Sequence, residues 1–314
     1  MPRRQPPRIG LALGAGSARG WAHIGVIRAL QDADIQPALV CGTSMGALVG
    51  AVYANGDLDW LQDWATKLTW QAVVRMLDIR FSGGLLGGAK LIEFFGQRFG
   101  DKNISELHLP FSAIATELET GREVWLQEGG VMDSVRASIA IPGLFTPVLR
   151  QGVWLVDGGL VNPVPVSVAQ AMRADVVIAV DLNNDILSAR SLGRLPPAEP
   201  SDEEAKPGSE AAPAKPWRGW LKAAGAEVGL TLPVKKVREP VPSLLTTMQQ
   251  GIRIMQVRIG RSRLAGEPAD ILVTPRLGAM GFLDFHRAGH AIEEGRLAVE
   301  RVMPEIKAQI GLDD

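Results

Sequence analysis

Short apolar runs alternate with segments that carry their apolar residues at helical spacing over the first part of the chain. Residues 9–13 (IGLAL) and 38–42 (ALVCG) contain no charged side chain, and runs of this length are typical of strands buried on both faces. Residues 21–30 and 45–54, which follow them, have the spacing of helices. Because strand–helix alternation builds a parallel sheet covered by helices, we predict an α/β fold of three layers, with a mostly parallel central sheet and helices on both faces.

The same patterns continue along the rest of the chain. Residues 57–99 contain three tryptophans and predict helices joined by a flexible, glycine-rich loop at 82–90 (SGGLLGGAK). The remaining predicted strands are 111–116, 123–127, 153–156, 176–180 and 271–274, and the remaining predicted helices are 131–140, 243–264 and 285–310.

Proline interrupts this pattern in one stretch. Eight of the 21 prolines lie within residues 184–241, among Ser, Glu and Lys, a composition that predicts a disordered insertion. It separates a first domain at 1–183 from residues 242–314, which we expect to complete the same domain. Within the insertion, Trp217 and Trp220 lie in a short segment with helical spacing. That segment predicts either peripheral membrane contact or a weak helix docked on the same chain.

Charge and cysteine content narrow the class of protein. The 314 residues include 33 basic and 34 acidic side chains, a net charge of −1, so we expect no nucleic-acid partner. Cys41 is the single cysteine, which excludes an intrachain disulfide, fits a reducing compartment and predicts a buried structural thiol. No apolar run reaches the roughly 18 residues that a membrane span needs. We therefore expect a cytoplasmic protein, and any membrane contact, at the inner membrane, would be peripheral.

A serine between two glycines is the first candidate for chemistry. Ser44 lies in GTSMG, after an apolar strand and before an apolar helix. A nucleophile elbow needs this strand–turn–helix arrangement, with small outer residues that let strand and helix approach closely. The alternative is a serine that caps a helix. The flanking residues of the elbow are Gly42, Thr43, Met45 and Gly46.

A glycine-rich loop follows the first strand. Residues 14–20 (GAGSARG) would let backbone N–H groups approach a ligand at the start of a helix, and such groups can stabilise a developing oxyanion. A dinucleotide-binding loop is the alternative, but Gly20 comes one residue later than the G-x-G-x-x-G fingerprint requires.

A carboxylate stands at the end of a later strand. Asp157 precedes Gly158 and Gly159, directly after the predicted strand at 153–156. A carboxylate at the C-terminal edge of a sheet can reach the same crevice as the serine and accept its proton. Taken alone, Asp before Gly is equally typical of a tight turn.

The three motifs together, AGSARG, GTSMG and DGG in this order, resemble the patatin-like phospholipases, as do the runs at 138–145 and 160–163. The resemblance covers about residues 8–182 and, more loosely, 243–310. It implies that residues 1–183 are a patatin-like catalytic domain, and that a phospholipid or lysophospholipid ester is cleaved without a metal or cofactor.

The resemblance also implies roles for individual residues. Ser44 would be the nucleophile and Asp157 its general base, and Arg19 would hold the glycine-rich loop or meet a phosphate. Residues 57–99, with the loop at 82–90, would form a cap and an acyl pocket. Ala15 and Ser17 stand where glycines are commoner, which leaves the geometry of the loop open. The loop residues of the implied oxyanion hole are Ala15, Gly16, Ser17, Arg19 and Gly20.

Three alternatives stay open at this point. A Ser-Asp-His triad would need His286 or His290, which lie four apart on a predicted helix. The same pair could suggest a metal face, but Arg287 follows the first histidine where zinc proteases need glutamate. A regulatory or membrane-associated binding protein with little turnover, or a nucleotide-binding protein, could also have this α/β pattern.

Overall fold

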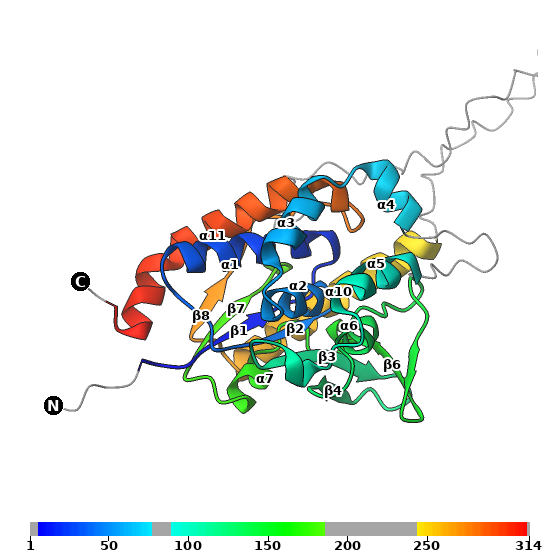
Figure 1. Ribbon diagram of the computed structural model, residues 1–314, viewed down its shortest axis with the longest axis horizontal. Coiled ribbons are helices and arrows are strands. Elements are labelled where there is room, and N and C mark those ends of the chain that lie inside the picture. Colours follow the sequence, from blue (N-terminus) through cyan, green and yellow to red (C-terminus); the bar gives the residue numbers. More distant parts are fainter. Residues whose placement is uncertain (1–5, 77–88, 186–243, 313–314) are drawn as a thin grey trace, which may run out of the picture. The chain divides into compact units, whose positions relative to one another are not determined.

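Two neighbouring strands, β1 (Ile9–Leu13) and β2 (Leu39–Thr43), lie in the middle of an eight-stranded sheet in the computed structural model of the chain (Figure 1). The structure describes residues 6–76, 89–185 and 244–312. Within these residues the chain has an α/β fold.

The sheet is mostly parallel. Strands that pair follow one another as β5-β6-β3-β2-β1-β7-β8, where β6 and β2 pair with successive parts of one edge of β3 and β4 pairs with its other edge. β1, β2, β3, β7 and β8 pair in parallel, whereas β4, β5 and β6 pair antiparallel. The other strands are β3 (Phe111–Glu117), β4 (Glu123–Leu126), β5 (Val148–Arg150), β6 (Val153–Asp157), β7 (Val176–Val180) and β8 (Ile271–Val273).

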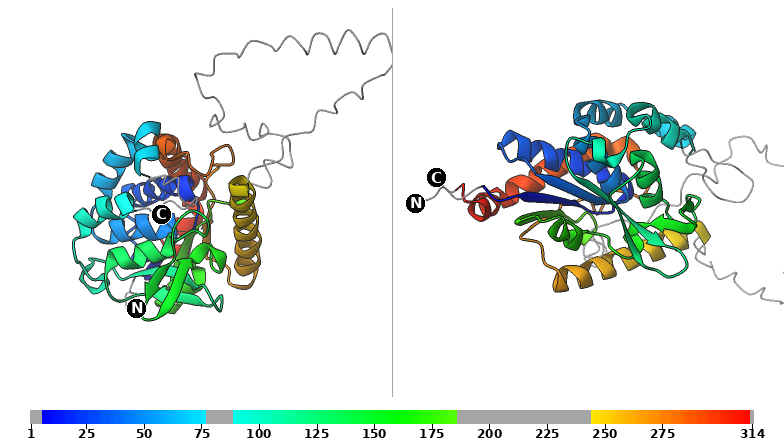
Figure 2. Two further views of the ribbon diagram at one scale, coloured as in Figure 1. Left: turned by 90° about the vertical axis from the view of Figure 1, so that its right-hand side faces the viewer. Right: turned by 60° about the horizontal axis from the view of Figure 1, so that its bottom comes forward.

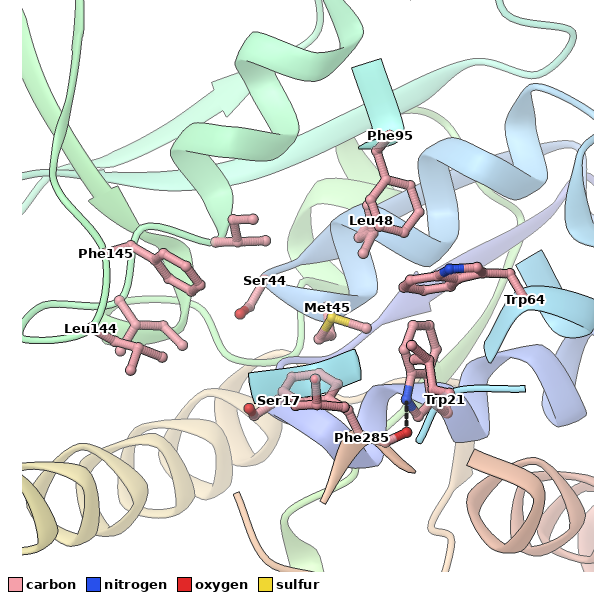
Figure 3. A pocket seen from close by; sticks show the side chains of 14 residues that line it. Ser17, Trp21, Ser44, Met45, Leu48, Trp64, Phe95, Leu144, Phe145 and Phe285 are labelled. Carbon is pink, nitrogen blue, oxygen red and sulfur yellow. Dashed lines mark hydrogen bonds between the residues drawn. The ribbon is translucent and has the colours of Figure 1, made fainter. Parts of the chain in front are cut away.

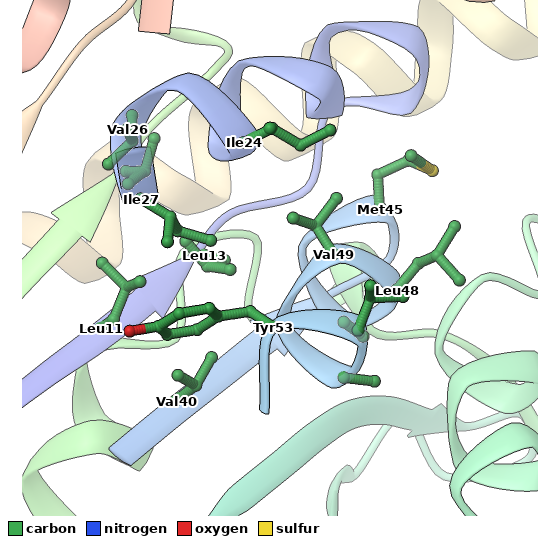
Figure 4. Packing of buried hydrophobic residues seen from close by; sticks show 14 of the residues in the cluster. Leu11, Leu13, Ile24, Val26, Ile27, Val40, Met45, Leu48, Val49 and Tyr53 are labelled. Atoms are coloured by element: carbon green, nitrogen blue, oxygen red, sulfur yellow. The ribbon is translucent and has the colours of Figure 1, made fainter. Parts of the chain in front are cut away.

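Side chains alternate between two cores, one on each face of the sheet. Leu11, Leu13 and Val40 join the larger core, which α1, α2 and α11 cover (Figure 4). Ala12 and Cys41 point to the smaller core on the opposite face. There α7 packs against the sheet and α10 lies along it (Figure 2). Helices therefore cover both faces, as predicted. The helices are α1 (Ala22–Asp32), α2 (Met45–Ala54), α3 (Leu58–Thr66), α4 (Trp70–Met76), α5 (Ala89–Phe99), α6 (Val131–Ser138), α7 (Val166–Ala171), α10 (Leu244–Gly266) and α11 (Ala288–Ile310).

The C-terminal helix packs directly on the first one. A Cβ atom on Gly25 of α1 would lie 1.8 Å from the carbonyl oxygen of Ile292, and one on Gly295 of α11 would lie 2.0 Å from that of Ala22. The two backbones meet closely because each helix places a glycine against the other. β8 adds a second link from the C-terminal segment, since it pairs with β7.

Some predictions fall outside the described residues. These are most of the insertion at 184–241, with Trp217 and Trp220, and the 82–88 part of the glycine-rich loop. Among the described helices, none is long and apolar enough to cross a bilayer.

Candidate active site

The pairing of β3 brings the candidate serine and aspartate together. Thr43, the last residue of β2, pairs with Ile114 of β3. Asp157, the last residue of β6, pairs with the next residue, Ala115. β4 pairs with β3 residues that overlap both of these pairings, so it must occupy the opposite edge of β3. β2 and β6 therefore share one edge and meet end to end. Ser44, which follows Thr43, therefore lies beside Asp157.

Ser44 occupies a strained turn between β2 and α2. Its φ of 58° and ψ of −123° lie in a region that side chains rarely adopt. Its N–H donates to the Ser138 hydroxyl at 2.9 Å, and that hydroxyl donates to the Ile114 carbonyl at 2.5 Å. The outer glycines of the motif allow the close packing of an elbow. A Cβ on Gly42 would lie 2.2 Å from the Gly46 carbonyl oxygen, and one on Gly46 would lie 2.1 Å from that of Leu13.

Asp157 is almost completely buried, with 1% of its surface exposed. Burial raises the pKa of its carboxyl to about 6, although the Ser44 hydroxyl and the Gly159 N–H act in the opposite direction. Oδ1 accepts the Gly159 N–H at 2.7 Å. Oδ2 has no hydrogen-bond partner among the described residues. The Ser44 hydroxyl is close enough to lower the pKa of the carboxyl, but its geometry does not meet the criteria of a hydrogen bond. Catalytic hydrogen bonds are often long in unliganded sites.

The glycine-rich loop holds most of its backbone amides in hydrogen bonds. Gly14 N donates to Val180 O at 3.1 Å and Ala15 N to Pro163 O at 2.8 Å. By contrast, neither Gly16 N–H nor Ser17 N–H donates to an acceptor within the described residues. These two amides can bind a ligand anion.

Ser17 stands where glycine is commoner, yet it adopts the conformation that the loop needs. Its φ is 48°, a left-handed value that glycine adopts more easily. Its hydroxyl donates to the Phe282 carbonyl at 2.7 Å, which helps to hold this conformation. The side chain at this position is thus compatible with the loop and anchors it.

The Arg19 side chain is buried and bonded to the glycine-rich loop. It is 1% exposed, and its Nε donates to the Gly16 carbonyl at 3.2 Å. Burial raises the pKa of Asp181 and of Asp185, and the charge of Arg19 lowers both. Arg19 was expected either to hold the loop or to meet a phosphate, and the structure shows the contact that holds the loop.

Three contacts at the site were not predicted from the sequence. Ser138 binds the Ser44 amide, as described above. Asn183, two residues after Asp181, donates its side-chain amide to the Ala15 carbonyl at 2.8 Å. His23 bonds the Gly14 carbonyl through Nε2 at 2.8 Å, and burial lowers the pKa of its ring to about 4. His23 is therefore a neutral support of the loop.

An apolar pocket opens at Ser44 and encloses roughly 710 Å³, including the part open to solvent (Figure 3). Apart from Ser17 and Ser44, every residue that lines it is aliphatic or aromatic or a methionine. Trp64 contributes from the Trp-rich stretch at 57–99, where we predicted a pocket. The lining residues are Ser17, Trp21, Ser44, Met45, Leu48, Trp64, Leu68, Val73, Phe95, Ile139, Ile141, Leu144, Phe145 and Phe285.

The histidines considered for a triad lie elsewhere. His286 and His290 are exposed, and neither lines the pocket. The His286 ring packs edge-on against Trp70, with centroids 5.7 Å apart. Within the described residues, no group of three or more His, Cys, Asp or Glu residues could hold a metal ion.

The fold and this apolar site define an α/β lipid ester hydrolase. The chain belongs to the patatin-like phospholipase family, because the sequence model of that family matches residues 11–169. The family that the three motifs indicated is thereby confirmed.

Relatives agree with this assignment. The chain is 34% identical, over 92% of its length, to an uncharacterized NTE family protein of Mycobacterium tuberculosis, and the match covers 89% of that protein. It is 32% identical to lysophospholipase nte1 of Emericella nidulans over 56% of this chain, which is 12% of the fungal protein. It is 33% identical to mouse patatin-like phospholipase domain-containing protein 6 over 56% of this chain, and 14% of the mouse protein is covered.

Proposed function

We propose that this protein hydrolyses acyl esters of phospholipids or lysophospholipids through an acyl-enzyme on Ser44, with Asp157 as its only general base. The observation that carries the proposal is the meeting of β2 and β6 on one edge of β3, which puts a strained serine beside a buried carboxylate. The apolar pocket at this serine suits an acyl chain. The name of the fungal relative, lysophospholipase, agrees with such a substrate.

The chemistry follows from these positions. Ser44 Oγ attacks the acyl carbonyl while its proton passes to Asp157. The amides of Gly16 and Ser17 donate to the resulting oxyanion. The intermediate collapses, Asp157 returns the proton to the leaving alcohol, and the acyl group stays on Ser44. Asp157 then takes a proton from water, which attacks the acyl-enzyme. The second intermediate collapses, the proton returns from Asp157 to Ser44 Oγ, and a fatty acid leaves.

A fluorophosphonate probe and three variants test the proposal. The probe should label the native protein at Ser44. Ser44→Ala should lose labelling, and both Ser44→Ala and Asp157→Asn should lower kcat by about 10⁴-fold or more, because residues that act as a unit fail together. Ser112→Ala is a matched control, since Ser112 is fully buried in β3 and its hydroxyl has no hydrogen-bond partner among the described residues.

Three results would contradict the proposal. Full esterase activity in folded Ser44→Ala would remove the nucleophile. An absence of labelling and turnover in the native protein would favour a binding protein with this fold. A large loss in His286→Ala or His290→Ala would instead restore the triad.

A further inference from the structure

We infer that Asn183 is a positioning residue that aims the Gly16 N–H at the reacting carbonyl. The inference rests on the proposed function, because it concerns the oxyanion hole of that reaction. Asn183 lies in the loop after β7, and β7 pairs with β1 so that Val180 is level with Leu13. The loop after β7 therefore runs beside the glycine-rich loop.

The argument depends on the planarity of the peptide bond. Ala15 C=O and Gly16 N–H belong to one trans peptide unit, in which the two groups point in opposite directions. The Asn183 amide holds that carbonyl at 2.8 Å, so it also fixes the direction of the Gly16 N–H. A carbonyl only accepts, so the NH₂ group of Asn183 is the group that faces it.

The next peptide unit is held in the same way. Gly16 C=O accepts from the backbone N–H of Arg19 at 3.2 Å and from its Nε at 3.2 Å, and the Ser17 N–H points away from that carbonyl. The Gly16 and Ser17 amides, which have no acceptor among the described residues, thus each have their direction set through the carbonyl on the other side of the same peptide plane. Asn183 and Arg19 hold one plane each.

The surroundings of Asn183 make this contact rigid. The residue is 3% exposed, and its backbone N–H donates to Asp181 Oδ1 at 2.9 Å. Leu182 packs against Gly16, where a Cβ would lie 2.5 Å from Leu182 Cδ1. The loop cannot shift toward Leu182 to compensate for a lost hydrogen bond.

Asn183→Leu tests the inference, because it keeps the branching of the side chain at Cγ and removes the donor. On a soluble p-nitrophenyl ester, kcat should fall by about tenfold or more, less than the 10²–10³-fold that follows loss of a whole oxyanion donor. KM should stay within about twofold, because the donor acts mainly in the transition state. A trifluoromethyl ketone, which forms an alkoxide on the serine, should bind more weakly by a factor similar to the loss in kcat.

Asn55→Leu is the matched control. Asn55 is also buried and accepts a hydrogen bond from Lys102 at 2.6 Å, but it lies at the far end of α2. It should lower the thermal midpoint and leave kcat and ketone affinity unchanged. If folded Asn183→Leu kept the native kcat and ketone affinity while Ser44→Ala was inactive, the inference would fail and the proposed function would stand.

A second inference comes from the outer face of α10, and we propose that this face binds an anionic phospholipid bilayer. It too rests on the proposed function, which makes a lipid the substrate. Three large apolar side chains on this helix, Met248, Ile254 and Met255, are 40%, 49% and 47% exposed. Arg258 and Arg261 continue the same stripe and are also exposed.

The charge and position of the stripe favour a lipid surface. Residues 244–266 contain four arginines and no acidic residue, and an apolar stripe with basic neighbours is typical of a helix at an anionic membrane surface. The stripe begins near the pocket. A Cβ on Gly143 would lie 2.7 Å from Met248 Cε, and Ile252 packs with the pocket residues Leu144 and Phe145.

Co-sedimentation with vesicles tests this surface. Wild type should bind vesicles of 70% phosphatidylcholine and 30% phosphatidylglycerol more tightly than pure phosphatidylcholine vesicles. The double variant Ile254→Glu, Met255→Glu should bind the mixed vesicles at least tenfold more weakly, with an unchanged thermal midpoint. The control, Leu149→Glu with Trp154→Glu, removes apolar side chains that are 56% and 43% exposed on β5 and β6, and should bind as wild type does.

Unchanged binding by the α10 variant, or an equal loss in the control, would overturn the second inference and leave α10 to another occupant, such as residues 186–243. Vesicle binding is measured without turnover, so this outcome is independent of the catalytic proposal.

Discussion

Ser44 keeps a backbone conformation that costs about 1–3 kcal/mol, and its neighbours hold it there. Its N–H is bonded to Ser138 Oγ, and the same hydroxyl bonds the Ile114 carbonyl. Ser138 therefore joins the elbow to β3. A single buried hydroxyl satisfies one donor and one acceptor at the strained position.

Ser138→Ala should consequently affect both stability and turnover. It leaves a buried amide and a buried carbonyl without this partner, so unfolding in urea should show a loss of about 1–3 kcal/mol, and kcat should fall as the elbow relaxes. Ser112→Ala, in the same sheet, should change the free energy of unfolding much less because its hydroxyl makes no bond within the described residues. Equal losses in the two variants would argue against a special role for Ser138.

The raised pKa of Asp157 predicts how activity depends on pH. As general base the carboxyl must be ionised, so kcat/KM should rise with pH, reach half of its plateau near pH 6 and stay high above it. A pH–rate profile on a soluble ester measures this limb. A half-maximum near pH 4 would show that burial does not control the base.

The same shift predicts that Asp157 lowers stability at neutral pH. Its folded pKa of about 6 exceeds the usual 3.8, so the protonated carboxyl stabilises the fold below pH 3.8, and that contribution is lost as pH rises through 6. Asp157→Asn should therefore be inactive yet more stable than wild type at pH 8, on the order of 3 kcal/mol, because one pKa unit corresponds to about 1.4 kcal/mol. Thermal unfolding at pH 4 and pH 8 measures the difference, which should shrink at the lower pH.

At the scale of elements, the turn between β2 and α2 depends on how closely the helix approaches β1. Gly46 sits in the first turn of α2, against the Leu13 carbonyl. A side chain there would push the helix away from the loop that follows β1. Strand, turn and helix thus form one packing unit with the glycine-rich loop.

Gly46→Ala should disrupt this unit. The added methyl would meet backbone 2.1 Å away, and overpacking of this kind typically costs about 1–3 kcal/mol, sometimes more. Gly289→Ala in α11 is the control, because nothing lies within 4 Å of its Cβ position and alanine favours a helix. Chemical denaturation should separate the two variants, one destabilised and one unchanged or slightly stabilised.

At the scale of the molecule, segments on both sides of residues 186–243 build one sheet. β8 and α11, from the C-terminal segment, pack on β7 and α1. The glycine contacts between α1 and α11 leave no space that another side chain could fill. The C-terminal helix is thus part of the core and not an appendage.

A chain that ends at residue 287 should therefore not fold. It would expose the apolar side of α1, which covers the sheet beside the glycine-rich loop. We expect loss of the cooperative thermal transition, measured by circular dichroism, and loss of labelling at Ser44. A truncated protein that melts cooperatively would contradict this reading of α11.

The sequence predicted the parts of the fold that have a local signal. β1 and β7 are apolar on both faces, so each appears as a continuous run. β5 has three half-buried or exposed residues, and α7 has six that follow Pro165, so neither produced a recognisable period. Ser44 and Asp157 could be predicted in the same way, because the glycines of the three motifs are a signal within short stretches of sequence.

The supporting residues of the site carry no such signal. Ser138 meets Ser44 across 94 residues of sequence, and Asn183 meets Ala15 across 168. Their roles come from contacts that only the folded sheet creates. A polar residue near the end of a strand is too common to be assigned without its partner.

The single cysteine can report when the central sheet opens. Cys41 is fully buried in β2, three residues before Ser44, and burial raises the pKa of its thiol far above the usual range. An alkylating reagent can reach it only when the strand between β1 and β3 detaches. Pulse labelling with a maleimide would then measure the rate at which the sheet opens, without an engineered probe. A covalent inhibitor on Ser44 should lower that rate.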